Sequence, residues 1–268
     1  MKLRPLVKYW LYGKCPGMAG AFPYYGVRVH FPKGSLSFKA ACQQGIFEAD
    51  NVTVLRALVE PDSCMFDVGA NIGLMAIPVL SAEPQCRVIS FDPSANVLPS
   101  LRKTIAGSPF GDRWTLVEKA VGAAPGTITF TLSSEADSLF DGIRPTHRVA
   151  SAAQVEVEMT TLDEVWIGAG KPRVSLIKID VEGAESEVLR GAAELLRVER
   201  PFVLLEWNRQ NLAAYGRPSD FILKFASEAD YEVMAVPGLN KVENTNQLKV
   251  HMVFTENFLL SPQGDRRS

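Results

Sequence analysis

Four short apolar runs in this chain each carry an acidic residue at or near their end. These acids are Asp67, Asp92, Asp180 and Glu206, and segments of helical spacing separate the runs. Apolar runs that alternate with helices are typical of a doubly wound, mostly parallel sheet with both faces buried. The carboxyl ends of its strands share one edge, where such sheets bind ligands. The sequence therefore predicts an α/β fold with the four acids gathered at that edge.

Periodicity divides the chain into further elements. Strand-type runs cover residues 64–69, 87–92, 115–122, 127–132, 174–183, 202–208, 231–236 and 250–255, and residues 155–166 supply a strand and a short helix. Helical spacing covers residues 52–58, 72–80, 95–105, 184–198 and 219–229. The runs at 231–236 and 250–255 are predicted to form an antiparallel pair, and residues 133–153 a loop or lid.

Length and composition fit one large domain with an N-terminal arm. We place the arm, or a small cap, at residues 1–45, the domain at 46–260 and a disordered tail at 261–268. No acidic residue precedes Glu48, while seven lysines and arginines do. Two interpretations are open: a surface for an anionic partner such as a phosphorylated carrier or membrane headgroups, or an arm that packs its aromatic side chains on the core. We prefer the second.

Composition also argues against several classes of protein. A net charge of −2 gives no sign of nucleic-acid binding. No run approaches the ~20 apolar residues of a membrane span, and the N-terminal residues lack the apolar stretch of a secretory signal. The four cysteines form no CxxC pair, which argues against a zinc site and favours reduced thiols in a cytoplasmic protein.

The first apolar run leads into a turn with two glycines, Gly69 and Gly73. A dinucleotide fingerprint needs the pattern GxGxxG, and a phosphate loop needs a lysine before serine or threonine; neither is present. Asp67, inside the strand end, would repel a pyrophosphate. S-adenosylmethionine suits the turn better, because its ammonium and sulfonium are positive and its carboxylate would accept hydrogen bonds from free amides of the turn.

Asp92 ends the second run, where nucleotide-binding sheets often carry an acid that binds ribose hydroxyls. Enzymes that bind NAD share this arrangement, so a nicotinamide oxidoreductase is the rival at the level of the fold, although Asp67 and the missing third glycine speak against it. A structural alternative for Asp92 is the N-cap of the helix that follows Pro93.

Together with FDVGANIG, TTLDEV and LLEWN, the segment VSLIKIDVEGAESEVLRGA resembles the FkbM family of S-adenosylmethionine-dependent methyltransferases. The resemblance runs from about Gly45 to Phe258, and IDVEGAE is its most specific element. It implies a class I methyltransferase fold, a seven-stranded sheet in the order 3-2-1-4-5-7-6. Family members with assigned roles mostly methylate hydroxyls on sugars or polyketide-type natural products.

The resemblance also implies site residues. It assigns the glycine turn to the donor, Asp92 to its ribose and residues 118–120 to the border of its adenine; Glu48 matches an acid often found before the first helix. The family usually has Glu at the position of Asp92, and Asp has a shorter reach. The donor-binding candidates are Glu48, Asp67, Gly69, Ala70, Asn71, Gly73, Asp92, Glu118, Ala120 and Asp180.

Methyl transfer is an in-line displacement, so the enzyme must align an acceptor atom and often remove its proton. Asp180 and Glu182 are the preferred catalytic acids, and His147 in the predicted lid is the alternative base. Glu206 and Asn208 end the next strand and are candidates for binding the acceptor. The set Asp180, Glu206 and Asn208 also permits a magnesium site, but hydrogen bonds to acceptor hydroxyls need the same groups, and we predict no metal.

Two further charged residues accompany these acids. Lys178 shares a strand face with Asp180 and is expected to pair with one of the acids. Glu185 lies in the first turn of the following helix, where the helix dipole favours a carboxylate. This structural role for Glu185 is as well supported by the sequence as a catalytic one.

The predicted function is that of an S-adenosylmethionine-dependent O-methyltransferase acting on a small-molecule hydroxyl, in a sugar or a secondary metabolite. An N-methyltransferase on an amine or peptide needs less base catalysis and is the alternative enzyme. A catalytically silent donor-binding protein is the alternative outside the enzymes, although the acids at four strand ends argue against it. The sequence leaves the acceptor and the oligomeric state undetermined.

Overall fold

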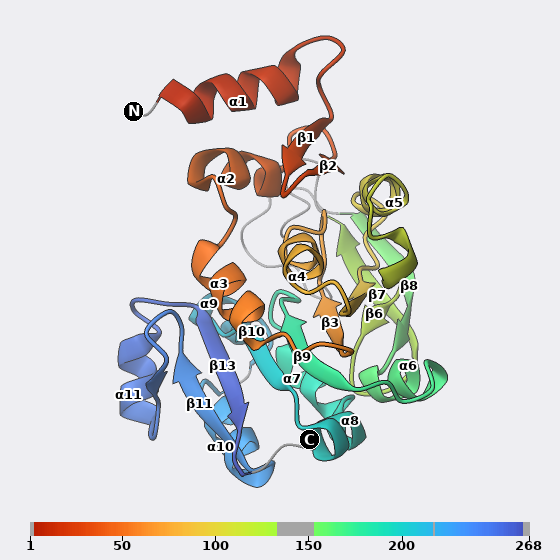
Figure 1. The fold of residues 1–268 in the computed structure, drawn as a ribbon. Coiled ribbons are helices and arrows are strands. Elements are labelled where there is room, and N and C mark those ends of the chain that lie inside the picture. Colours follow the sequence, from red (N-terminus) through yellow and green to blue (C-terminus); the bar gives the residue numbers. More distant parts are fainter. Residues whose placement is uncertain (1–2, 133–152, 217, 265–268) are drawn as a thin grey trace.

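The computed structural model describes residues 3–132, 153–216 and 218–264. Its centre is a sheet of eight strands in the order β12-β11-β13-β10-β9-β3-β4-β5 (Figure 1). The strands are β3 (Cys64–Val68), β4 (Arg87–Phe91), β5 (Trp114–Val117), β9 (Val174–Ile179), β10 (Phe202–Glu206), β11 (Tyr231–Ala235), β12 (Asn240–Lys241) and β13 (Asn257–Pro262).

The strand order confirms the predicted topology. Strands β5, β4, β3, β9 and β10 pair in parallel, and β13 pairs antiparallel with both β10 and β11. Numbered along the chain from β3, and with the short β12 left out, the order is 3-2-1-4-5-7-6. The difference from the prediction is β12, a two-residue strand that pairs with β11 at the sheet edge.

Helices cover both faces of the sheet. Neighbouring strand residues point to opposite sides, and apolar residues on both sides are buried under helices. Met65 belongs to the core under α3, α4 and α5, whereas Phe66 belongs to the core under α6, α7, α8 and α10. The helices around the sheet are α3 (Ala49–Leu58), α4 (Ala76–Ala82), α5 (Leu98–Ala106), α6 (Leu162–Gly168), α7 (Glu185–Arg190), α8 (Ala193–Glu199), α9 (Arg209–Ala214), α10 (Phe221–Glu228) and α11 (Thr245–His251), with a 3₁₀ turn at Gly111–Arg113.

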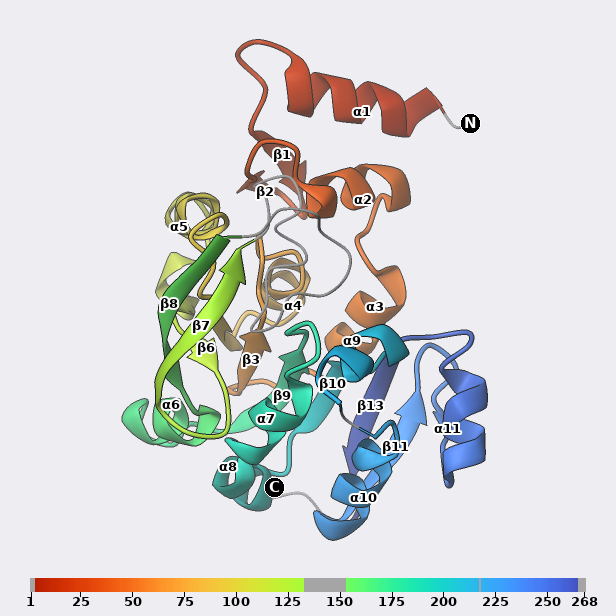
Figure 2. The ribbon, with the colours of Figure 1, turned by 180° about the vertical axis from the view of Figure 1, so that it is seen from behind.

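The N-terminal segment forms a cap above the carboxyl ends of the parallel strands (Figures 1 and 2). It contains α1 (Leu3–Lys14), the hairpin β1 (Ala21–Tyr24) and β2 (Val27–His30), and α2 (Leu36–Gln44). Phe31 stacks on Phe38 with ring centroids 3.8 Å apart, and Phe22 packs against both. These rings continue into the core under α3 and α4, as the preferred interpretation of the arm predicts.

A smaller sheet lies beside the main one. Its strands β6 (Ala120–Val121), β7 (Gly126–Leu132) and β8 (Ala153–Thr160) are arranged in the order β6-β8-β7. The predicted single strand at 115–122 is therefore two strands, β5 and β6, in two different sheets. Most of the predicted lid at 133–153 lies outside the described residues.

Two predicted elements are wrong. Residues 250–255 form no strand: α11 covers the first two, and its start is capped by Asn244, whose Oδ1 accepts hydrogen bonds from the amides of Asn246 and Gln247. The antiparallel partner of β11 is instead β13. The single helix predicted at 184–198 is two helices, because the Asp163 carboxylate accepts hydrogen bonds from the amides of Glu194 and Leu195 and so caps a separate α8.

Three findings bear on the ends and surface of the chain. Strand β13 continues to Pro262, past the predicted start of the tail at 261, and residues 265–268 lie outside the described part. No helix within the described ranges combines the length and apolar composition that a bilayer crossing needs. The four cysteines carry free thiols.

Candidate functional site

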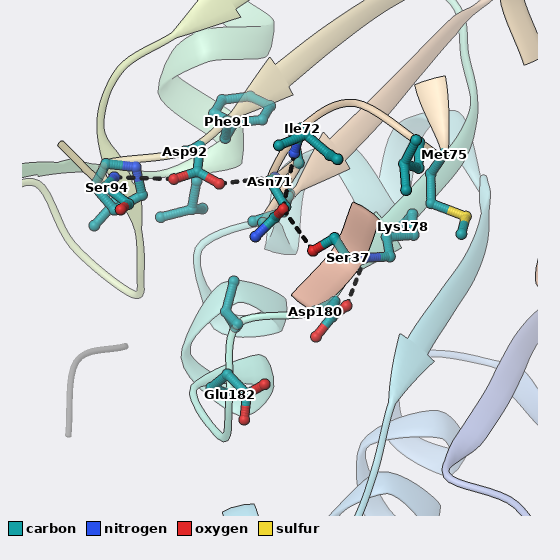
Figure 3. A pocket seen from close by; sticks show the side chains of 18 of the residues that line it. Ser37, Asn71, Ile72, Met75, Phe91, Asp92, Ser94, Lys178, Asp180 and Glu182 are labelled. Carbon is teal, nitrogen blue, oxygen red and sulfur yellow. Dashed lines mark hydrogen bonds and ion pairs between the residues drawn. The ribbon is translucent and has the colours of Figure 1, made fainter. Parts of the chain in front are cut away.

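A pocket opens at the carboxyl ends of β3, β4 and β9, beneath the N-terminal cap (Figure 3). The turn after β3 and the residues after β4 and β9 form its walls, and Ser37 and Phe47 reach it from the N-terminal side. The lining residues are 37, 47, 68–72, 74–75, 91–94, 119–121, 130, 178 and 180–182. Of the predicted site residues, Gly69, Ala70, Asn71, Asp92, Ala120, Asp180 and Glu182 meet there.

The two glycines are required by close approaches. A Cβ built on Gly69 would lie 1.8 Å from the carbonyl oxygen of Asp180, and its φ of +78° is one that side chains disfavour. A Cβ on Gly73 would lie 2.7 Å from the Trp114 ring. Gly69 therefore lets the turn at residues 69–73 touch the end of β9, and Gly73 lets it pack on β5. We call this segment the donor turn, after the role that the family resemblance implies for it.

The amides of the turn are occupied within the protein. Gly69 and Ala70 donate hydrogen bonds to the carbonyl of Phe91, and Gly73 donates to Ala70. The amide of Asn71 donates to Asp92, and the amide of Ile72 to the Asn71 side chain. The expectation that free amides of this turn receive the donor's carboxylate is therefore wrong for residues 69–73.

Asp92 fastens the turn to the end of β4. Its Oδ2 accepts the Asn71 amide at 2.8 Å, and its Oδ1 accepts the Ser94 amide at 2.9 Å. The second contact is the local turn expected of an aspartate before a helix. A carboxylate oxygen can accept more than one hydrogen bond, and Asp92 lines the pocket.

The N-terminal cap completes the pocket through Ser37. Its hydroxyl donates a hydrogen bond of 2.8 Å to Oδ1 of Asn71, the same oxygen that receives the Ile72 amide. Asn71 has a positive φ of 49°, so its conformation is one that needs support. Ser37 is buried, and the contact ties α2 to the donor turn.

Lys178 lies among buried and half-buried carboxylates at the floor of the pocket. Its Nζ lies 2.9 Å from Oδ2 of Asp180, the pairing predicted from the sequence. Burial acts to lower the pKa of Lys178, but the charges of Asp180, Asp67 and Glu48 outweigh burial and raise it. The lysine is therefore a firmly held cation beside the end of β9.

Asp180 and Glu206 share a hydrogen bond across the ends of β9 and β10. Burial opposes ionisation of Asp180, but Lys178 and the hydrogen bond from Glu206 lower the pKa of Asp180. Burial and the charges of Asp180 and Glu182 raise the pKa of Glu206 well above its ordinary value. Of the two groups, Asp180 therefore favours its ionised form more strongly than Glu206 does.

Carboxylate oxygens of Asp180, Glu182 and Glu206 all lie within 4.8 Å of one another. Such a cluster attracts a proton or another positive group, and oxygens at this spacing can also ligate a divalent cation, the alternative that the sequence left open. Glu185 plays a different part, since its Oε1 accepts the amides of Val181 and Gly183 and closes the turn that carries Glu182.

The remaining predicted residues that the structure describes lie outside the pocket lining, Gly73 and Glu206 among them. Asp67 is fully buried beneath it, and Glu48 is held by the side-chain amide of Asn51. Glu118 forms an ion pair with Arg102 at the surface. Asn208 caps α9 by accepting the Asn211 amide at 2.8 Å. His147 lies outside the described residues.

Several lining residues were not among the predicted site residues. Ser37, Phe47 and Phe130 reach the pocket from the cap and the small sheet. Their neighbours in sequence form no motif, so nothing short of the fold reveals them. Lys178 was predicted to pair with an acid, and its place on the same strand face as Asp180 was the signal for a pocket position as well.

The Methyltransferase FkbM domain family matches residues 67–233. The chain belongs to this family. The matched segment includes the donor turn, Asp92, the IDVEGAE element and β10, so it covers the described pocket except for Ser37 and Phe47. S-adenosylmethionine is the methyl donor of FkbM methyltransferases.

Two relatives give further context for this FkbM-family chain. It is 30% identical over 171 residues to 2-O-methyltransferase NoeI of Sinorhizobium fredii. This alignment covers 59% of this chain and 69% of NoeI. It is 28% identical over 184 residues to hexuronic acid methyltransferase AglP of Haloferax volcanii, covering 68% and 69%. The solved methyltransferase FkbM of Methylobacillus flagellatus is 15% identical with a TM-score of 0.47, covering 84% of this chain and 54% of that one.

The chemistry of the lining fits the family's donor. S-adenosylmethionine presents ribose hydroxyls, a purine, an ammonium and a carboxylate. The pocket offers Asp92 as an acceptor for hydroxyls, the apolar side chains of Val121 and Phe130 as a surface for a ring, and the opposite charges of Asp180 and Lys178 for the two ends of an amino acid.

Proposed function

We propose that this chain is an O-methyltransferase that acts on a hydroxyl group of a sugar or a secondary metabolite. The observation that carries the proposal is the cluster of Asp180, Glu182 and Glu206 carboxylates at the end of β9 and β10, next to the donor turn. A hydroxyl is a weak nucleophile at neutral pH, so its methylation benefits from a carboxylate that accepts the proton. The name of NoeI, a 2-O-methyltransferase, supports methylation of a hydroxyl, and the name of AglP, a hexuronic acid methyltransferase, supports a sugar-type acceptor.

In this proposal Asp92 binds the ribose of the donor, and Lys178 and Asp180 bind its carboxylate and ammonium. When bound, S-adenosylmethionine supplies an electrophilic methyl group. The cap above the pocket excludes water through Phe47, and the Ser37 contact holds the donor turn in place. These residues align the reacting groups, which is the main requirement of an in-line displacement.

Glu182 is proposed as the group that receives the acceptor's proton. Asp180 is engaged by Lys178 and Glu206, which makes it a poorer base than its charge alone implies. Glu182 lines the pocket beside Asp180, in the turn that Glu185 closes. Asp180 then acts as the group that positions the donor, and Lys178 beside it favours the ionised form of Asp180.

The test is a turnover assay with S-adenosylmethionine and a panel of sugar, polyketide and amine acceptors, read by mass spectrometry and by NMR of the methyl position. We expect methyl ethers, and we expect Glu182→Gln to lower kcat by roughly 10²- to 10⁴-fold with donor affinity unchanged. Glu187→Gln, on an exposed ion pair with Arg190, is the matched control. A product methylated on nitrogen would replace the proposal with the N-methyltransferase, and donor binding without any turnover would favour a silent binding protein.

A further inference from the structure

Helix α1 presents an apolar face to solvent. Leu6, Val7 and Trp10 are 44%, 53% and 57% exposed. The other side of the helix packs on the cap, where Tyr9 stacks on Phe38 with ring centroids 5.7 Å apart. The exposed residues therefore form a second apolar face of α1, of which Val7 borders a groove against α2.

Basic side chains border this face. Arg4, Lys8 and Lys14 are exposed, and none of the ion pairs found within the described ranges includes them. The chain has seven lysines and arginines and no aspartate or glutamate before Glu48. The charge of this segment is thus positive without local compensation, although the whole chain has a net charge of −2.

The position of α1 leaves the face accessible. Figure 1 shows α1 as the element farthest from the main sheet, beyond α2 and the hairpin. Its packing partners are α2 and β1, both within the cap. A broad flat partner can therefore approach α1 without meeting the other helices and strands that the structure describes.

We propose that α1 docks on an anionic lipid bilayer surface, with Leu6, Val7 and Trp10 in the headgroup region and the basic residues on lipid phosphates. Aromatic and aliphatic side chains on one face, with lysine and arginine beside them, are the features of helices that lie in a membrane interface. Each basic residue near an anionic leaflet adds attraction that salt weakens.

A bilayer fits this face better than a second copy of the chain does. Pairing two α1 faces would bring two basic segments together without acidic partners, and like charges at an interface oppose association. Anionic lipid supplies both the apolar depth for Trp10 and the negative charge for Arg4 and Lys8. The proposal concerns where the protein works and is independent of the proposed reaction.

The intrinsic fluorescence of the chain provides a direct readout. Of its four tryptophans, Trp10 is the exposed one, and Trp114, Trp166 and Trp207 are at most 2% exposed. Transfer of Trp10 from water into the headgroup region shifts its emission to shorter wavelength. Titration of the full chain with phosphatidylcholine vesicles, with and without phosphatidylglycerol at a quarter of the lipid, is therefore the experiment, together with vesicle co-sedimentation.

We expect a blue shift and co-sedimentation with the anionic vesicles, at least tenfold weaker binding to phosphatidylcholine alone, and loss of binding as NaCl increases. Leu6→Ser combined with Val7→Ser should abolish co-sedimentation, and Arg4→Glu combined with Lys8→Glu should remove the preference for anionic vesicles. Phe254→Ser, at an 83% exposed position away from α1, is the matched control and should bind as the wild type does.

Thermal unfolding and S-adenosylhomocysteine binding show whether each variant is folded. Equal binding to both kinds of vesicle, no spectral shift, or unchanged binding by the folded serine variant would overturn the proposal. Light scattering that reveals a dimer lost in the serine variant, with no vesicle binding by the wild type, would assign the face to a second copy instead.

Discussion

The Ser37 hydroxyl donates a hydrogen bond of 2.8 Å to Oδ1 of Asn71 and joins the N-terminal cap to the donor turn. Ser37→Ala removes this support from a residue with positive φ. A single buried hydrogen bond contributes about 1 kcal/mol, so we expect the Kd for S-adenosylhomocysteine to rise roughly fivefold, measured by calorimetry. Ser37→Thr should restore most of the affinity, and Ser81→Ala, on the exposed side of α4, should leave it unchanged. Equal affinity of Ser37→Ala and wild type would show that the cap does not hold the turn.

A comparison of variants at Asp92 and Glu118 tests where the donor binds. Asp92 lines the pocket, whereas Glu118 is engaged by Arg102 at the surface. We expect Asp92→Ala to weaken S-adenosylhomocysteine binding by more than a hundredfold, because hydrogen bonds to a charged group and the anchor of the Asn71 amide are lost together. Glu118→Ala should change the Kd by less than twofold. Comparable losses in the two variants, measured by calorimetry on folded protein, would contradict the placement of the donor.

Alanine substitutions at Gly69 and Gly17 distinguish the energetic cost of a steric clash from the cost of backbone strain. Both have φ near +80°, but a Cβ on Gly69 would lie 1.8 Å from the Asp180 carbonyl oxygen, and a Cβ on Gly17 would contact nothing within 4 Å. We expect Gly17→Ala to lower the free energy of unfolding by about 1–2 kcal/mol and Gly69→Ala to lower it by considerably more, as measured by urea unfolding. Similar values for the two would mean that β3 and β9 separate easily at this end.

Asp67 makes stability depend on pH. Burial raises its pKa from an ordinary 3.8 to about 6, because the carboxylate loses its hydration. The folded protein then binds more protons at this group than the unfolded chain does, so the free energy of unfolding decreases as the pH rises from about 4 to about 6. This contribution, up to about 3 kcal/mol, is fully present below pH 4 and lost above pH 6.

Asp67→Asn removes that titration. We expect urea unfolding at pH values from 4 to 7.5 to show a flatter dependence in the variant than in the wild type. Lys178 loses a carboxylate neighbour in the variant only at pH values where Asp67 of the wild type is ionised, so the slope between pH 4 and 6 is the measurement. Parallel curves would show that Asp67 titrates at its ordinary pKa.

Much of the sheet and its acidic edge follows from the sequence. Apolar runs with both faces buried leave little choice but central parallel strands, and the acids that follow β4 and β9 then lie at one edge. The strand predicted at 250–255 was wrong because apolar content does not guarantee burial. Val253 and Phe254 are 66% and 83% exposed. Asn244, a helix cap, was the local signal that outweighed it.

Residues of the candidate site could be predicted only where they lie in a recognisable sequence motif. Asp92 and Asp180 lie in recognisable elements, and both line the pocket. The occupied amides of the turn were not predictable, because they depend on Phe91 and Asp92 from the neighbouring strand. Ser37 was missed for the same reason: its partner is 34 residues away, and no periodic pattern links the two.

Strands β3 and β9 are direct neighbours, with Asp67 opposite Lys178 and Val68 opposite Ile179. The separation between the glycine bend and the carboxylates beyond β9 is consequently set by the sheet repeat of about 4.8 Å and not by flexible side chains. Under the proposed function, these two strands thus fix the line along which the methyl group is transferred, while the segments proposed to contact the acceptor can vary in sequence. A laboratory search for altered acceptor preference is best directed at those segments, with these two strands held fixed.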